Sequence, residues 1–183
     1  SPLGKNGFRD LSRQLGRQYV HLFDGRGLGE QLAGPGHERR GNLAGEVRLG
    51  GSIQLGYLTQ DQSSLNADEN SVETMMPYFP NETQARSFLA YYLLTGDETL
   101  KPTAILSYGQ RARLMLAMLV AQGCNCLLLD EPINHLDIPS RTRFEQALNR
   151  FPGAVLAVVH DRYFIDHFAT SLWLVEEGKM RQS

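Results

Sequence analysis

The sequence predicts an α/β domain built on a mostly parallel β-sheet. Helix and strand patterns alternate through the second half of the chain. The stretch Cys126–Asp130 is apolar until its final acid, which is typical of a parallel strand covered on both faces. With 183 residues, 42% of them hydrophobic, the chain is long enough for one domain with its own core. These observations together favour a layered α/β architecture.

Composition excludes several classes of protein. The formal net charge of −2 argues against a broad surface that neutralises nucleic acid. The longest apolar run, Leu114–Ala121, is far shorter than the roughly 20 residues needed to span a bilayer. No signal-peptide pattern opens the sequence, so we expect a soluble intracellular protein. Cys124 and Cys126 have no further metal-ligating residues nearby, and we interpret them as structural.

In the first half of the chain, only some segments carry a clear secondary-structure pattern. Residues 1–51 are glycine-rich, and no helix or strand can be assigned there. Alternating apolar residues predict a strand at Ser52–Leu58, followed by a polar loop at Asp61–Asn70. Asn81 is a suitable N-cap for a helix covering Thr83–Leu94.

The elements of the second half follow one another closely. Ser107 begins a helix whose second half, Leu114–Ala121, is apolar all round and is expected to be buried. Ser140 can cap the next helix. The remaining predicted elements are strands at Cys126–Asp130, Ala154–Val159 and Leu172–Val175, and a short helix at Asp161–Ala169.

Polar residues stand where the predicted strands end. Gln60, the pair Asp130 and Glu131, and His160 each follow an apolar strand. Ligands of parallel sheets bind at these carboxyl ends. In phosphoryl transfer, one acid can hold Mg²⁺ while the next polarises the attacking water. Taken alone, however, an apolar run that ends in Asp-Glu is more often a solvated acidic turn.

The start of the helix at Ser107 offers a second polar feature. A helix N-terminus exposes unpaired N–H groups, which suit a phosphate. Gly109 would allow close approach of an anion, and the Ser107 hydroxyl could add a hydrogen bond. By itself, the same pattern is explained more simply by a serine N-cap.

Five motifs occur in a fixed order, and their sequence resembles that of ATP-binding cassette (ABC) ATPases. Gln60 resembles the Q-loop glutamine, L-S-Y-G-Q-R at 106–111 the signature motif, and L-L-D-E-P at 128–132 the Walker B motif. N-H-L-D at 134–137 resembles the D-loop, and V-H-D at 159–161 the switch histidine. The sequences of residues 134–140 and 160–166 are similar to those of the ABC-F branch. Within that branch they resemble the second of its two cassettes.

This resemblance implies an ABC-type P-loop NTPase fold with a helical signature subdomain. A single nucleotide-binding domain would occupy residues 1–183. Its core ATPase lobe would comprise 1–60 and 123–183, and the helical subdomain would comprise 61–122.

The resemblance also implies roles in ATP hydrolysis. Asp130 would help hold Mg²⁺ through water, and Glu131 would activate the hydrolytic water. His160 would contact the γ-phosphate and sense its loss. Gln60 would coordinate Mg²⁺ and couple the sheet to the helical subdomain.

Other residues are expected to act across an interface between two cassettes. By the same resemblance, Ser107, Gly109 and Gln110 would contact the γ-phosphate of nucleotide bound on the partner cassette. Asp137 would communicate across that interface. No adenine-stacking residue is identified, and Tyr19 and Phe23 are only candidates.

The phosphate-binding loop breaks the pattern. A P-loop requires G-x-x-x-x-G-K-[ST]. Gly34, Pro35 and Gly36 begin as the family would, but neither Lys-Ser nor Lys-Thr follows. Either the sequence omits residues of a mobile loop, or the protein is a deletion or a degenerate cassette. The short N-terminal pieces favour the first explanation, and Arg39 and Arg40 are best interpreted as surface residues.

The functional expectation is therefore a cytoplasmic ATPase of the ABC-F type. ATP with Mg²⁺ would drive closure onto a second cassette, in the same chain or in a homodimer. The resemblance implies action on the ribosome, in translation control or antibiotic resistance, without membrane insertion. The alternatives are a nucleotide-binding subunit of a membrane transporter and an interaction domain that has lost ATP binding.

Overall fold

The computed structural model describes residues 19–23, 50–58, 64–176 and 179–182. These residues form two compact units. Unit 1 comprises the described residues up to Tyr57, residues 125–131 and those from Pro152 onward. Unit 2 comprises residues 58–124 and 132–151. The segment 132–151, which the sequence places in the core lobe, groups with the helical residues in this division.

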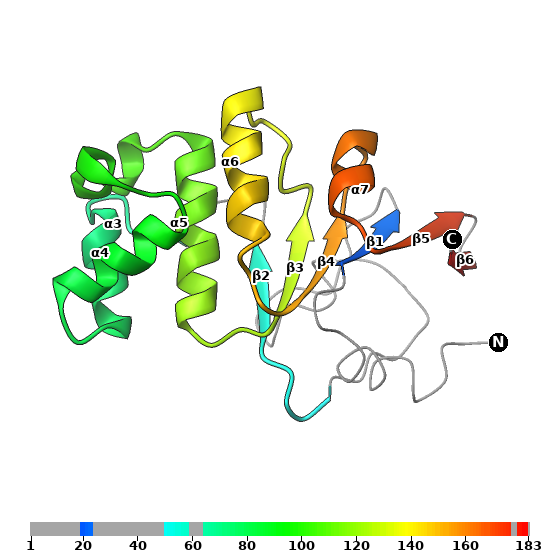
Figure 1. Cartoon of the computed structure of the whole chain (residues 1–183), viewed down its shortest axis with the longest axis horizontal. Coiled ribbons are helices and arrows are strands. Elements are labelled where there is room, and N and C mark those ends of the chain that lie inside the picture. Colours follow the sequence, from blue (N-terminus) through cyan, green and yellow to red (C-terminus); the bar gives the residue numbers. More distant parts are fainter. Residues whose placement is uncertain (1–18, 24–49, 59–63, 177–178, 183) are drawn as a thin grey trace. The chain divides into compact units, whose positions relative to one another are not determined.

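A mostly parallel six-stranded sheet has the strand order β2-β3-β4-β1-β5-β6 (Figure 1). The pairs β3–β4, β4–β1 and β1–β5 are parallel, and only β6 runs antiparallel to its neighbour β5. The sheet confirms the predicted α/β class. Its strands are β1 (Tyr19–Phe23), β2 (Leu55–Leu58), β3 (Cys126–Asp130), β4 (Ala154–Val158), β5 (Ser171–Glu176) and β6 (Lys179–Gln182).

The central strand β1 corrects the expectation that residues 1–51 contain no assignable element. Tyr19 pairs with Val155 of β4, and Val20 pairs with Ser171 of β5, so β1 hydrogen-bonds on both edges. Four aromatic or aliphatic residues around His21 suit a strand, but the surrounding glycines hide the pattern. Pairing on both sides supplies the stability that the local sequence does not indicate.

Strand β2 is shorter than the predicted Ser52–Leu58 because Asn125 forms hydrogen bonds with the residues that precede the strand. The Asn125 side chain accepts a hydrogen bond from the Gln54 N–H (2.9 Å) and donates one to the Ser52 carbonyl (2.8 Å). The Asn125 N–H also donates to the Gln54 carbonyl. These bonds fasten the start of β2 to the start of β3, whose predicted bounds are confirmed.

The polypeptide of unit 2 is mainly helical. Asn81 caps α4 as predicted, since its side chain accepts from the Gln84 N–H (3.0 Å). The helix ends earlier than the predicted Leu94 because Leu93 adopts a left-handed conformation (φ 61°). The helices of this unit are α3 (Ser71–Met75), η1 (Met76–Tyr78), α4 (Glu82–Tyr91), η2 (Gly96–Leu100), η3 (Thr103–Ile105), α5 (Tyr108–Ala121) and α6 (Ile138–Leu148).

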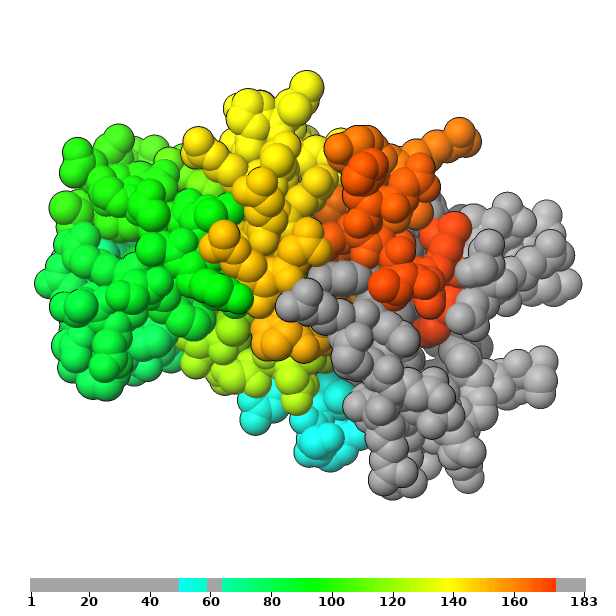
Figure 2. All heavy atoms as spheres, viewed as in Figure 1, coloured from blue at the N-terminus to red at the C-terminus, as the bar shows by residue number. Residues whose placement is uncertain are grey.

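Helix α5 forms the centre of unit 2, and α6 packs against it. Figure 2 shows the yellow atoms of α6 lying directly against the green atoms of the neighbouring helices. The buried part of α5 runs from Ala112 to Ala117, whereas residues 118–121 are half-buried. The prediction that the whole of Leu114–Ala121 is buried is therefore wrong at its C-terminal end. Leu114 and Leu116 of α5, and Phe144 and Leu148 of α6, are fully buried and belong to the core of the protein.

Helix α7 (Arg162–Phe168) follows β4 in unit 1. The Asp161 side chain caps it by accepting from the Phe164 N–H (2.8 Å). Phe164 and Phe168 are buried, and their rings pack 4.9 Å apart. The cap and this aromatic pair fix the turn that contains His160.

Candidate functional site

The carboxyl ends of β3 and β4 bring the first group of predicted site residues together. Asp130 is the last residue of β3 and pairs with Val158, the last residue of β4. The Glu131 N–H then donates to the Val158 carbonyl (3.0 Å). This bond continues the pairing one residue beyond the ladder. Because the two strands end together, the residues that follow them emerge at the same edge of the sheet.

Glu131 and His160 face each other at this edge. The distance between Glu131 Oε1 and His160 Nε2 is 3.3 Å, and their side chains are 31% and 53% exposed. Glu131 holds a positive φ of 47°, a left-handed conformation that is strained for a residue with a side chain. Strained backbone of this kind is concentrated at functional sites. The pair therefore combines a carboxylate and an imidazole that solvent can reach.

In unit 2, the predicted signature residues form a capping box. The Ser107 hydroxyl oxygen accepts from the Gln110 N–H (3.2 Å), and the Gln110 side-chain oxygen accepts from the Ser107 N–H (2.8 Å). Tyr108, the first residue of α5, packs edge-on against the His135 ring at 5.9 Å. Ser107 and Gln110 thus both organise the N-terminus of α5.

Gly109 has a packing role that the sequence does not show. A Cβ atom at this position would lie 2.8 Å from Ser140 Cβ and 3.3 Å from Leu136 Cδ2. Both of those atoms belong to the segment that begins α6. A glycine is therefore required for the close contact between the first turns of α5 and α6, whatever else the position does.

Asp137, rather than Ser140, caps α6. The Asp137 carboxylate accepts from the Ser140 N–H (2.8 Å), which places Ser140 inside the first turn. Pro139 also lies in that turn, where its missing N–H costs nothing. The prediction that Ser140 is the N-cap is wrong, because α6 already begins at Ile138 and the Ser140 N–H is itself one of the donors that Asp137 caps. The Ser140 hydrogen bonds lower the pKa of Asp137.

The remaining predicted site residues fall outside the described residues. These are Gly34, Pro35, Gly36 and Gln60. For the adenine-stacking candidates Tyr19 and Phe23, the structure defines only their places in β1.

The missing phosphate loop is a property of this sequence. The full sequence has 183 residues and runs without a break through 34–41. The explanation that residues of a mobile loop are omitted is therefore wrong. The chain's three lysines are Lys5, Lys101 and Lys179, and serine or threonine follows none of them. No G-x-x-x-x-G-K-[ST] motif exists anywhere in the 183 residues.

The part of the chain that the structure describes contains neither a membrane-spanning helix nor a metal-binding cluster. No helix there has the length and apolarity needed to cross a bilayer. Nor does any group of three or more His, Cys, Asp or Glu residues within those ranges form a metal site by itself. Cys126 is buried in β3, and burial raises the pKa of Cys124.

Sequence reasoning missed Glu98, which contacts the signature residues. Its side chain accepts from the Gln110 amide (2.6 Å) and from the Thr95 N–H (2.8 Å). The signal was available, because threonine followed three residues later by glutamate is a capping-box pattern. The contact with Gln110 depends on the packing of unit 2, and no local pattern indicates it.

The parallel sheet, its acidic strand end and the capped helical unit define an α/β domain with a candidate site at its strand ends. Residues 44–134 match the model of the ABC transporter family. The chain belongs to the ATP-binding cassette ATPases and is a nucleotide-binding domain of the ABC-F type.

Curated relatives support this assignment. The chain is 41% identical over 128 residues to the putative ATP-binding protein YdiF of Bacillus subtilis, covering 69% of the chain and 20% of the relative. It is 33% identical over 141 residues to the energy-dependent translational throttle protein EttA of Mycobacterium tuberculosis, covering 74% of the chain and 25% of the relative. It is 35% identical over 132 residues to mouse ATP-binding cassette sub-family F member 3, covering 70% of the chain and 19% of the relative. The chain thus spans a quarter or less of the length of these relatives.

Two solved structures share the fold. One is the dimeric post-hydrolysis state of the ATP-binding cassette MJ0796 bound to ADP and Pi (TM-score 0.57, 20% identity). The match covers 72% of this chain and 62% of that one. The other is an inward-facing conformation of a putative metal-chelate type ABC transporter (TM-score 0.68, 18% identity). That match covers 91% of this chain and 71% of the transporter chain.

Proposed function

We propose that this chain is one cassette of an ATP-hydrolysing ABC-F protein that works as a pair with a second cassette. The second cassette would lie in the same protein or in a second copy of it. Membership of the ABC ATPases supports this reaction class. The solved dimer of a related fold, with ADP and Pi bound, supports the pairing.

The contact between Glu131 and His160 is the observation that carries the proposal. Glu131 would take a proton from the attacking water, and His160 would hold the glutamate's orientation and contact the γ-phosphate. The 3.3 Å separation and the common strand edge allow both side chains to reach one phosphate. A glutamate held at positive φ is directed by its backbone, so its carboxylate position does not depend on side-chain packing alone.

Mg²⁺ would bind beside this pair. It usually takes one or two carboxylates and completes its shell with phosphate oxygens and water. Asp130, half-exposed at the end of β3, fits that requirement without a dedicated cluster of acids. When bound, the ion would neutralise charge on the transferring phosphate. Gln60 is proposed as a further ligand from its motif.

The residues at the start of α5 would act on nucleotide held by the partner cassette. The Ser107 hydroxyl and the first N–H groups of α5 are suited to a γ-phosphate. Gln110 would act by shaping this helix start, since both ends of its amide are engaged within the protein. Asp137 would support the interface by fixing the first turn of α6 beside Gly109.

A degenerate cassette is the second candidate, and the absence of a P-loop lysine favours it. Each charge-assisted contact to phosphate contributes roughly 1.5–3 kcal/mol, so losing several weakens ATP binding by orders of magnitude. We expect calorimetry to show no ATP binding by the 183-residue chain at micromolar concentrations. Tight binding would mean that other residues hold the phosphates.

Restoring the loop tests whether residues 34–41 belong to the nucleotide site. Residues 34–41 read G-P-G-H-E-R-R-G, so Arg39→Gly, Arg40→Lys and Gly41→Ser together recreate the P-loop pattern without changing the length. We expect this triple variant to gain ATP affinity that calorimetry detects. The matched control replaces Arg40 with alanine in the same background and should gain none. Equal binding by both variants would remove residues 34–41 from the nucleotide site.

The wider role is proposed from the ABC-F relatives. The name of EttA describes a translational throttle, which supports action on the ribosome, in translation control or antibiotic resistance, and a cytoplasmic location. A transporter subunit is the alternative. Co-sedimentation of the protein with ribosomes, with and without ATP, tests this role. Failure to sediment with ribosomes in either condition would contradict it.

A further inference from the structure

Glu98 joins two elements of unit 2 through its carboxylate. One oxygen, Oε1, accepts from the Thr95 N–H (2.8 Å), which caps the short helix η2. The other, Oε2, accepts from Gln110 Nε2 (2.6 Å). A charged acceptor makes each of these bonds stronger than a neutral one would be. Glu98 therefore links η2 to the first turn of α5.

Gln110 transmits this link to Ser107. Its side-chain oxygen accepts from the Ser107 N–H, and its own N–H donates to the Ser107 hydroxyl oxygen. The amide nitrogen of the same side chain donates to Glu98. Because one end of the amide accepts and the other donates, its orientation is fixed. The capping box of α5 is thus held from outside the helix.

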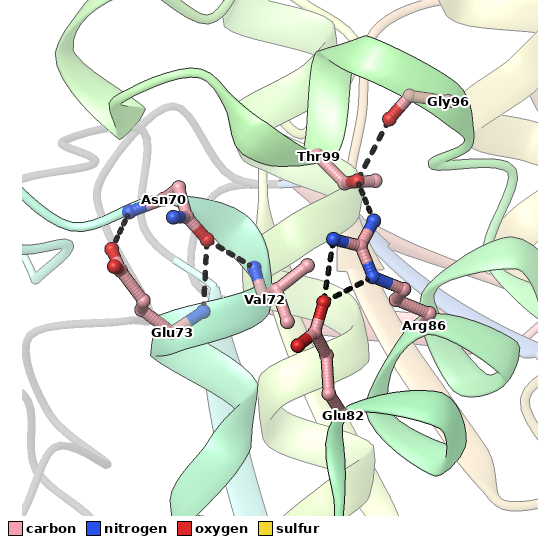
Figure 3. A network of polar contacts seen from close by, with 7 residues as sticks. All are labelled: Asn70, Val72, Glu73, Glu82, Arg86, Gly96 and Thr99. Atoms are coloured by element: carbon pink, nitrogen blue, oxygen red, sulfur yellow. Dashed lines mark hydrogen bonds and ion pairs between the residues drawn. The ribbon is translucent and has the colours of Figure 1, made fainter.

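The position of Glu98 is itself fixed by a separate network. The Thr99 hydroxyl donates to the Gly96 carbonyl (2.8 Å) and accepts from Arg86 Nη1 (3.4 Å). Arg86 is paired with Glu82 at 2.6 Å on the preceding turn of α4. Figure 3 shows this chain of contacts from Glu82 through Arg86 to Thr99 and Gly96. Thr99, the residue after Glu98, therefore fastens η2 to α4.

Glu98 also compensates a buried charge. Arg113 is only 1% exposed, and its Nε has no hydrogen-bond partner among the described residues. Burial lowers the pKa of Arg113, and attraction to Glu98 opposes that shift. A neutral residue at position 98 would leave this guanidinium without the attraction that opposes its burial.

We infer that Glu98 is a positioning residue, which through Gln110 holds the Ser107–Gln110 segment in its shape before any ligand arrives. The inference rests on the proposed function for its purpose, because that function assigns this segment to the γ-phosphate. The geometry itself involves no nucleotide. Glu98 would act on affinity and pairing, and it would not touch the reacting atoms.

The test uses nuclear magnetic resonance on the ligand-free 183-residue chain. The Glu98→Ala variant should move the Gln110 side-chain amide resonance toward its solvent-exposed position. Exchange of the Ser107 amide hydrogen should accelerate by on the order of tenfold, as expected for loss of one charge-assisted restraint. Asp97→Ala is the matched control, since Asp97 is the exposed neighbouring acid on η2. It should change neither signal.

A second variant, in which the side chains of Glu98 and Gln110 are exchanged, distinguishes loss of this one contact from general misfolding. The double variant Glu98→Gln/Gln110→Glu reverses the carboxylate–amide bond and leaves the total charge of the protein unchanged. We expect it to restore slow exchange at Ser107 even where Glu98→Ala loosens the whole unit. An unchanged Gln110 resonance in Glu98→Ala, or no recovery in the double variant, would overturn the inference.

The proposed function is judged separately. In the loop-restored background, Glu98→Ala should raise the KM for ATP several-fold in paired cassettes and leave kcat nearly unchanged. Absence of any ATP turnover in that background would contradict the proposed function, while the resonance experiment would still decide the role of Glu98. A several-fold fall in kcat without a change in KM would contradict a positioning role.

Discussion

In unit 1, Glu131 and His160 follow neighbouring parallel strands, and their side chains meet across 3.3 Å at a solvent-accessible edge. In unit 2, the side chains of Ser107, Gln110 and Asp137 turn back onto the helices that they begin. Strand ends project side chains beyond the ladder, whereas helix starts demand partners for their unpaired N–H groups. Residues of unit 1 should therefore affect chemistry more than stability, and those of unit 2 the reverse.

The largest expected effect is that of Glu131→Gln on turnover. Loss of the carboxylate that polarises water should slow ATP hydrolysis by roughly 10²–10⁴-fold, with ATP binding retained. Single-turnover assays of paired cassettes in the loop-restored background measure it. Asp166→Asn, a change at an exposed carboxylate of α7, serves as the control. Near-normal hydrolysis would remove Glu131 from the mechanism and contradict the expectation that residues of unit 1 affect chemistry more than stability.

Gly109→Ala should cause the largest loss of stability in unit 2. The added methyl would lie 2.8 Å from Ser140 Cβ, so the two helix starts must separate. We expect a loss of about 1–3 kcal/mol, as for other overpacked contacts, which exceeds the gain from replacing a helical glycine. Urea unfolding measures this. Gly51→Ala, where the new methyl meets nothing within 4 Å, should be almost neutral.

The strain at Glu131 gives a smaller and more specific effect. At ordinary positions a glycine variant is less stable than the alanine variant by roughly 0.5–1 kcal/mol. At φ 47° the order should reverse, with Glu131→Gly more stable than Glu131→Ala by about 1 kcal/mol. Thermal unfolding of both variants tests this, with the same two substitutions at Glu145 in α6 as the reference. Alanine being the better residue at both positions would argue against strain.

The smallest expected effect is the pH dependence from Asp137. Its pKa is lower in the folded protein than the ordinary 3.8, so its contribution is fully present above that pH and is lost as the pH falls through the folded value. Asp137→Asn keeps an N-cap but cannot titrate. The difference in unfolding temperature between the native protein and this variant should therefore shrink below pH 3.8. A constant difference across the acid range would exclude this contribution.

Local sequence predicted the elements whose signals are short-range. The Ser107 and Asn81 caps and the strand Cys126–Asp130 are confirmed, since each depends on neighbours within a few residues. Ser140 was predicted as the cap of the next helix because serine is a good capping residue, but the backbone path makes Asp137 the residue that accepts the N–H. Strand β1 escaped prediction because its stability comes from two neighbouring strands.

The fold class, the order of the motifs and the absence of a P-loop lysine can all be read from the amino-acid sequence alone. Which of these residues come into contact depends on how the elements pack. Glu131 reaches His160 because β3 and β4 pair in register, Gly109 is required because α6 packs against α5, and Glu98 binds Gln110 because η2 is fastened to α4. Such contacts join residues distant in the chain, and their geometry arises from packing that no local pattern specifies.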